Sequence, residues 1–239
     1  MEVRDGFIVG IFNYCDGWCE RCALTSYCRL FADRMEMEAS LDPNLKAVAD
    51  APPLPEELPP PPPAWMQELF EEINDACRNP PSRKEWQRMR PRVPAEHKPI
   101  DRRAKDYAMR THHWLTATAA PSGDAKDEAR EVIAWFHFLV VAKINRALTR
   151  SPDDDVDDAG DNDGSAKVAL LGIDRSHGAW LDLVERAAVT AADAEPFIAD
   201  LVWLGEALEG VRPRARAFVR PAFDEPDAVA QFLAQQRGR

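Results

Sequence analysis

The chain has 239 residues, 45% of them hydrophobic and 30% charged, which is enough for one full-sized domain with its own core and a small appendage. Its formal charge of −11 disfavours a general affinity for nucleic acid. No stretch reaches the ~18 consecutive apolar residues of a membrane span, and the N-terminus lacks a secretory pattern, so we expect a soluble, cytoplasmic protein with no membrane partner.

Residues 1–50 form the first predicted segment. They contain an apolar run predicted as a strand, Phe7 to Phe12, then four cysteines, then a helix from about Tyr27 to Ala39. So short a segment generally needs a metal or a disulfide to order it. Because no export signal is visible, we expect reduced cysteines, and clustered reduced cysteines usually bind metal. We therefore predict a cysteine-rich metal-binding module at 1–50.

The four clustered cysteines have the spacing Cys-x3-Cys-x2-Cys-x5-Cys. A Cys-x2-Cys turn lets two thiolates face one metal, and two further thiolates complete a tetrahedral or cubane site. Arg21 and Arg29 are expected to lie beside the sulfurs and lower the thiol pKa. This compact spacing favours a [4Fe-4S] cluster, with zinc as the alternative. The predicted metal ligands are Cys15, Cys19, Cys22 and Cys28.

The stretch from Cys19 to Phe31 resembles the Cys-x2-Cys-x5-Cys ending of [4Fe-4S] sites in CRISPR-associated and recombination nucleases. The resemblance implies a cluster but no nuclease activity, because the Asp and Glu-x-Lys residues of those enzymes are not found here. The first three cysteines also resemble the radical SAM signature, but Arg21 stands where that family has an aromatic residue. As a whole, the chain resembles bacterial proteins with a cysteine-rich N-terminus, which implies no activity.

A polyproline linker at 51–64 is predicted to be a stiff spacer, because proline fixes φ and removes backbone donors. Beyond it, we predict an α-helical bundle domain at 65–239. Its first helix carries an apolar stripe at a helical period and stops at the prolines that follow Asn79. The stripe consists of Trp65, Leu69, Ile73 and Cys77. Cys77 is therefore not expected to bind metal.

Periodicity and capping residues predict the remaining helices. Asp101 is expected to cap a helix that ends near Ala117, and the almost wholly apolar segment 125–149 is expected to be the central core helix. The acidic segment 151–165 is predicted to be a solvated and dispensable loop. Helices should then follow at 166–188, 194–209 and 225–236, the last capped by Asp224. The predicted fold class is mainly α, a helical bundle with a small four-cysteine module.

Six polar residues of the bundle are candidates for a second site: His112, His113, Glu131, His137, Asp174 and His177. Di-iron bundles use two Glu-x-x-His pairs, and this chain has neither. We therefore expect structural roles. Asp174 should point toward the apolar stripe of its helix and form a buried ion pair with Lys143 or Arg146, because an unpaired buried carboxylate is costly.

The segment from Arg78 to Arg110 is basic, with eleven Lys or Arg against four Asp or Glu. Its interleaved aromatic residues, Trp86, Tyr107 and Trp114, suggest a nucleic-acid surface. The alternative, which the acidic balance of the whole chain favours, is a solvated basic face paired with the acidic loop.

These patterns together favour a non-enzymatic metalloprotein that acts with a protein partner in interaction or assembly. A redox enzyme or electron-transfer protein with an iron-sulfur cluster is one alternative, and a nucleic-acid-binding accessory protein is another. The chain has no Gly-x-Ser-x-Gly elbow, phosphate-binding glycine loop or dinucleotide fingerprint, so no catalytic residue is assigned.

Overall fold

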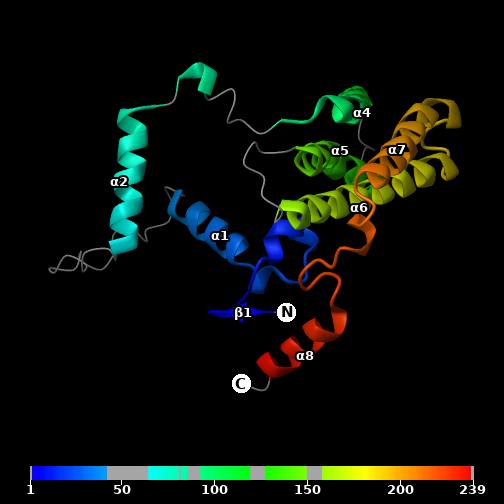
Figure 1. Cartoon of the computed structure of the whole chain (residues 1–239). Coiled ribbons are helices and arrows are strands. Elements are labelled where there is room, and N and C mark those ends of the chain that lie inside the picture. The colour runs from blue at the N-terminus through cyan, green and yellow to red at the C-terminus, as the bar shows by residue number, and fades with distance from the viewer. Residues whose placement is uncertain are drawn as a thin grey trace. The chain divides into compact units, whose positions relative to one another are not determined.

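The computed structural model describes residues 2–41, 64–80, 82–85, 92–118, 127–149 and 158–237. Its contacts divide the chain into two compact units, residues 1–32 with 92–239, and residues 33–91. The mainly helical fold class is confirmed (Figure 1). Among the described residues, no helix is long and apolar enough to cross a membrane. The predicted linker lies outside the described residues except for Ala64.

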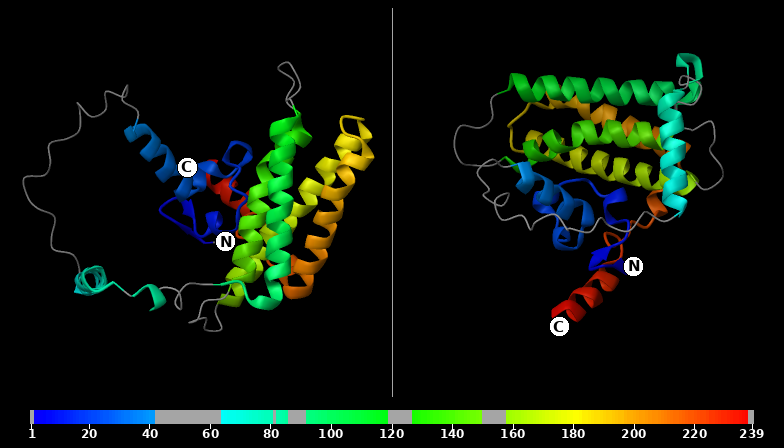
Figure 2. Two further views of the ribbon diagram at one scale, coloured as in Figure 1. Left: turned by 90° about the horizontal axis from the view of Figure 1, so that it is seen from above. Right: turned by 90° about the vertical axis from the view of Figure 1, so that its left-hand side faces the viewer.

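Four helices form the centre of the first unit. They are α4 (Lys98–Ala117), α5 (Glu128–Leu148), α6 (Asp158–Glu185) and α7 (Ala191–Val211). Helix α4 contacts α5 and α7, and α6 contacts the same two helices, so the contacts close into a four-helix bundle. The four helices lie side by side in both views of Figure 2. The predicted bundle is therefore present.

Helix α5 is the central core helix that its apolar sequence predicts. Asp127 caps it by accepting a hydrogen bond from the Arg130 backbone N–H. Its buried residues include Ile133, Phe136, Val140, Ile144 and Leu148. Helix α6 approaches α5 closely at Gly172, where an added Cβ would lie 2.9 Å from the Val140 side chain. This glycine allows the two helices to pack tightly.

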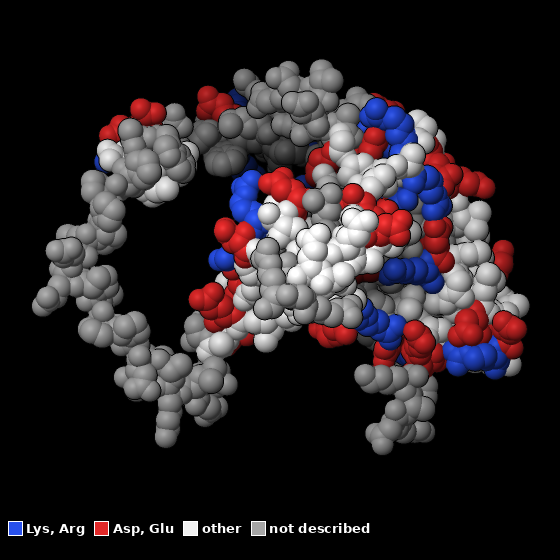
Figure 3. Space-filling model, turned by 90° about the horizontal axis from the view of Figure 1, so that it is seen from below, with Lys and Arg blue, Asp and Glu red and all other residues white. Residues whose placement is uncertain are grey.

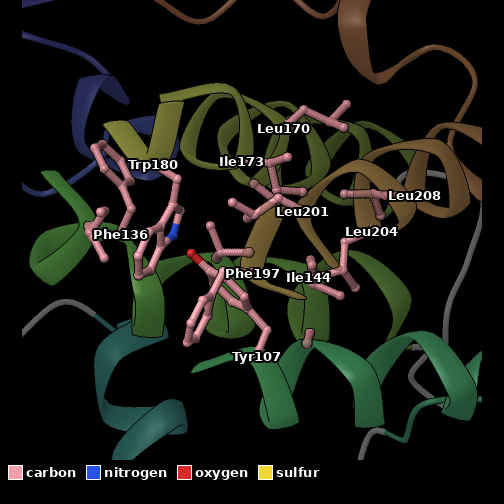
Figure 4. Close-up of a cluster of buried hydrophobic side chains, with 14 of the residues drawn as sticks. Tyr107, Phe136, Ile144, Leu170, Ile173, Trp180, Phe197, Leu201, Leu204 and Leu208 are labelled. Carbon is pink, nitrogen blue, oxygen red and sulfur yellow. The ribbon is translucent and has the colours of Figure 1, made fainter. Parts of the chain in front are cut away.

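The bundle core also contains polar groups (Figure 4). Trp180 is fully buried and stacks on Phe197, with ring centroids 4.4 Å apart. Tyr107 is fully buried nearby, and its hydroxyl lies close to the indole nitrogen of Trp180 in Figure 4. Burial raises the pKa of Tyr107, and the neighbouring donors of Trp180, Thr111 and Ser176 partly offset that rise. Tyr107 is therefore a neutral phenol in the core.

The acidic segment is not a solvated loop over its whole length. Helix α6 begins at Asp158, so residues 158–163 form its first turns. Asp161 accepts two hydrogen bonds from Arg146, and buried Asp163 pairs with Arg214 at 3.0 Å. The helix dipole also favours carboxylates at this end. The prediction of a dispensable loop is wrong for 158–163, while 151–157 lie outside the described residues.

Several other element boundaries differ from the sequence prediction. The expected strand at Phe7 to Phe12 is a two-residue strand, β2 (Phe7–Ile8), paired antiparallel with β1 (Val3–Arg4). Helix α1 spans Arg29–Leu41, starting after the last clustered cysteine. Asp101 lies inside α4, where its carboxylate binds Lys105 and Asn145, and does not cap that helix. The last helix, α8, spans Pro226–Arg237.

The second unit contains the amphipathic helix that the apolar stripe predicts. This helix, α2, spans Ala64–Arg78. Its apolar residues Leu69, Phe70 and Ile73 are exposed, and so is Cys77.

Candidate metal centre

Three consecutive 3-10 turns place the clustered cysteines. The turns are Ile11–Tyr14, Cys19–Arg21 and Thr25–Tyr27. Each turn is followed at once by a cysteine in extended conformation, Cys15, Cys22 and Cys28, while Cys19 opens the second turn. Gly10 and Gly17 have positive φ angles of 72° and 71°, which favour glycine and let the chain reverse between turns. The local sequence thus sets the spacing of all four thiols.

All four thiols line one small cavity of about 30 Å³. Its apolar wall includes Ile11, Phe12, Trp18, Phe31 and Phe223. All four cysteines are partly buried, whereas Cys77 is exposed in the other unit. Within the described residues, no three His, Cys, Asp or Glu side chains are grouped as a single metal ion requires. The four cysteines therefore share a cavity without converging on one point.

The surroundings of the sulfurs are partly those of free thiols. The Cys15 thiol donates a hydrogen bond to the Phe12 carbonyl at 3.4 Å, and burial raises its pKa. The Cys22 sulfur accepts the Leu24 backbone N–H at 3.4 Å. An N–H aimed at sulfur also stabilises a thiolate. A metal is bound by thiolates, and burial opposes formation of the thiolate at Cys15.

The cation that acts on Cys15 is Lys143 of α5, which opposes the rise in the pKa of that thiol. Its ammonium donates to the Asn13 carbonyl at 3.3 Å, so α5 holds it beside the cysteine loop. Nothing in the sequence pattern indicates this contact, because 128 positions separate the two residues. Only the tertiary fold brings them together.

Arg21 does not have the role that its position in the sequence suggests. Its guanidinium lies 4.0 Å from the centre of the Trp18 ring and hydrogen-bonds to Glu128 and Glu131 of α5. Arg29 lies over the Phe7 ring at 5.4 Å. Neither arginine is among the causes that lower the pKa of Cys15. Arg21 therefore fastens the cysteine module to α5. The positive charge that lowers the pKa of Cys15 is that of Lys143.

The cysteine module is fixed to the bundle mainly around Asp16 and Trp18. Trp18 stacks on Trp135 of α5, with ring centroids 5.0 Å apart. The Trp135 indole donates to the Asp16 carbonyl at 2.9 Å, and Arg175 of α6 donates to the Asp16 carboxylate at 2.6 Å. The loop between Cys15 and Cys19 is thus held by α5 and α6.

A second contact joins the module to the start of α6. The Tyr14 ring lies against Gly164, where an added Cβ would be only 2.3 Å from Tyr14 Cε1 and 2.9 Å from Phe218 Cζ. The Tyr14 hydroxyl donates to Asp161 at 3.3 Å. A glycine is required here, because no side chain fits between the helix and the ring.

The C-terminal helix covers the other side of the module. Phe232 of α8 is buried in a small second core with Ile8, Ile11 and Leu24. Its ring meets Tyr27 edge-on, with centroids 4.9 Å apart. The two ends of the chain therefore meet around the cysteines, an arrangement that the sequence does not indicate.

Among the described residues the six polar candidates for a second site form no metal-binding group, although His112 lies beside both His113 and His137. His137 is buried with its Nδ1 2.7 Å from the Ala134 carbonyl, and it stacks on His112. Glu131 pairs with Arg21. The expectation for Asp174 is wrong, since its side chain is 49% exposed and pairs with Arg216, not with Lys143 or Arg146. His113 and His177 join no metal-binding group within the described residues.

Two arginines and two of the aromatic residues of the basic stretch have partners inside the molecule. Arg103 and Arg110 both bind the buried carboxylate of Asp200 in α7. Tyr107 is fully buried and Trp114 packs on Trp180, so neither ring is free to stack on a base. The acidic partner of these two arginines among the described residues is Asp200. Trp86 lies outside the described residues. On the face in Figure 3, charges of both signs are interspersed.

Comparison with known proteins gives no match. No family model, curated protein or solved structure is similar to this chain at a significant level. The local motif resemblances therefore stay predictions, and the functional argument rests on the geometry of the cysteine module.

Proposed function

We propose that Cys15, Cys19, Cys22 and Cys28 bind one metal centre, a [4Fe-4S] cluster with zinc as the alternative. We further propose that the protein acts in interaction or assembly with a protein partner and not as a catalyst. The observation that carries the proposal is that three successive turns bring four thiols to the wall of one cavity. The proposal requires a reducing compartment such as the cytoplasm, because metal-binding thiols must stay reduced.

Zinc and a four-iron cluster require different separations of the sulfurs. Tetrahedral zinc with Zn–S bonds of ~2.3 Å holds its sulfurs roughly 3.8 Å apart, so the thiols must converge on one point. In a four-iron cluster each thiolate binds a different iron, and the sulfurs stay farther apart. The compact Cys-x3-Cys-x2-Cys-x5-Cys spacing is the reason for placing the cluster before zinc.

The position of the module supports a structural role for the metal within the chain. Its contacts reach α5, α6 and the C-terminal helix α8. A metal bound to the cysteines would lock a segment too small to have a large core of its own, and metal-binding energy in such modules is folding energy. Loss of the metal is therefore expected to loosen both ends of the chain.

Electron transfer is the second candidate, and the aromatic stack favours it. Trp18 lines the cysteine cavity and stacks directly on Trp135. Polarisable rings next to a cluster provide a short route for an electron toward the outside of the module. A reversible one-electron reduction of the loaded protein would favour this role. A loaded centre that cannot be reduced would favour the structural role.

The test is metal analysis and visible absorption of protein purified without oxygen. Absorption at about 400 nm with four irons per chain is expected for the cluster, whereas a colourless protein with one zinc indicates the alternative. Each of the four cysteines is changed to alanine in turn, with Cys77→Ala as the matched control. Loss of the metal is expected in the four variants and not in the control.

Two results would contradict the proposal. One is full metal retention in any two of the four variants. The other is loss of the metal on Cys77→Ala alone. Circular dichroism of each variant separates loss of metal from loss of the bundle, because the core of α4 to α7 contains none of the four cysteines.

A further inference from the structure

A second, larger cavity lies beside the cysteine module. Its volume is about 810 Å³, within the range of ~300 to 1,000 Å³ typical of small-molecule sites. Its walls come from the loop at 16–24, from α5 and α6, and from the C-terminal segment 220–233. It shares Asp16, Trp18, Cys22 and Phe223 with the cavity of the four thiols. The two cavities are therefore neighbours with a common wall.

The lining of the large cavity is mostly apolar. Three aromatic rings, those of Trp18, Phe136 and Phe223, contribute to it. The aliphatic residues are Leu24, Val132, Val229 and Leu233. Removing such a surface from water stabilises a complex by roughly 25 cal/mol per Å² of apolar area. A ligand with an aromatic or aliphatic framework therefore suits this lining better than a strongly hydrated ligand.

Each aromatic ring of the cavity has an arginine over it. Arg21 lies over Trp18 at 4.0 Å, Arg175 over Phe136 at 5.4 Å and Arg220 over Phe223 at 5.1 Å. Carboxylates hold all three: Arg21 binds Glu128 and Glu131, and Arg220 binds Asp224 through both Nε and Nη2. The wall thus contains three arginine–aromatic pairs, in each of which a guanidinium group lies over a ring.

Arg175 differs from the other two in its unused donors. Its only hydrogen bond among the described residues runs from Nη1 to Asp16 at 2.6 Å. Its Nε and Nη2 groups have no acceptor in the part of the chain that the structure describes, and its side chain is 51% exposed. A guanidinium with free N–H groups is the preferred partner of a carboxylate or sulfonate.

We propose that this cavity binds a planar aromatic anion, an aromatic ring system that carries one carboxylate or sulfonate. The ring system of the ligand packs against the aliphatic part of the lining, Leu24, Val132, Val229 and Leu233. The anionic group accepts from the free N–H groups of Arg175. A cationic ligand is disfavoured, because Asp16 and Glu128, the two acidic residues of the lining, are already bound by arginines. Binding does not require the metal centre, so this proposal can fail while the metal proposal stands.

The test uses two probes of the same shape, 1-naphthoate and its neutral amide, 1-naphthamide. Their dissociation constants are measured by calorimetry on the full chain. Three variants are compared with the parent protein: Arg175→Ala, Ala230→Trp and Arg102→Ala. Ala230 is an exposed residue of α8 on the cavity wall. An indole at this position would fill part of the cavity without replacing a buried side chain. Arg102 is an exposed arginine of α4 outside the cavity and serves as the control.

The expected result is saturable 1:1 binding of naphthoate, at least tenfold tighter than naphthamide. Arg175→Ala should weaken naphthoate at least tenfold and change naphthamide less than twofold. Ala230→Trp should abolish binding of both, and Arg102→Ala should change neither. The proposal is overturned if naphthoate does not bind, if the two probes bind equally, or if Ala230→Trp with a native circular dichroism spectrum still binds naphthoate.

Discussion

His137 is a buried titratable group of the bundle with a lowered pKa. Burial lowers its pKa, and His112, stacked on it with ring centroids 5.8 Å apart, lowers it further. The hydrogen bond between Nδ1 and the Ala134 carbonyl acts in the opposite direction. Nε2 is buried without a partner among the described residues. The folded state therefore favours neutral His137.

This shift predicts a loss of stability in acid. The pKa of unfolded His137 is ~6.5 and the folded value is lower, so the unfolded state binds the proton more readily. The contribution of His137 is fully present above about pH 6.5 and is lost as the pH falls toward the folded pKa. Urea midpoints at pH 7.5 and pH 5.5 should differ less in His137→Gln than in the parent. His113→Gln, at an exposed position, should not reduce the difference.

At the scale of elements, the fit between Tyr14 and α6 predicts opposite effects of two alanine substitutions in one helix. Gly164→Ala should destabilise the protein by ~1 to 3 kcal/mol, because its Cβ would overlap the Tyr14 ring. Gly160→Ala has nothing within 4 Å of the added Cβ and should be neutral or stabilise by up to ~1 kcal/mol. Thermal unfolding of both variants is the measurement. Equal effects would show that Tyr14 does not pack there.

Two arginines of α4 share a single carboxylate of α7. Asp200 is buried and binds Arg103 and Arg110, whereas Asp174 is half exposed and binds Arg216. Asp200→Asn should therefore cost ~1 to 3 kcal/mol, below the full value for a buried pair because both arginines reach solvent. Asp174→Asn should cost less than ~1 kcal/mol. Urea unfolding of the two variants ranks them, and the reverse order would contradict the assigned partners.

At the scale of the whole molecule, the two hydrophobic cores predict that the C-terminal helix can be removed without unfolding the bundle. The large core is built from α4 to α7, and the small one joins α8 to the cysteine module. Deletion of residues 226–239 should leave the main melting transition within ~3 °C of the parent. The same deletion should speed the reaction of the four thiols with Ellman's reagent in metal-free protein. A large drop in melting temperature would mean that α8 supports the bundle directly.

Local patterns in the sequence were sufficient for most of the helices. The apolar run of α5, the stripe of α2 and the end of α4 near Ala117 all follow from interactions within a few residues. The spacing of the four cysteines is local as well, since all four lie within fourteen residues. Their metal remains a prediction.

The tertiary structure decided which partner each charged group finds. Asp174 pairs with Arg216, Lys143 acts on Cys15, and Asp158 to Asp163 join α6 because Arg146, Arg214 and Tyr14 meet them there. It also placed α8 on the cysteine module. A sequence pattern fixes which face of an element is apolar, because that depends on residues three or four positions apart. It does not fix which distant charge comes within ~4 Å, because that depends on how whole helices pack.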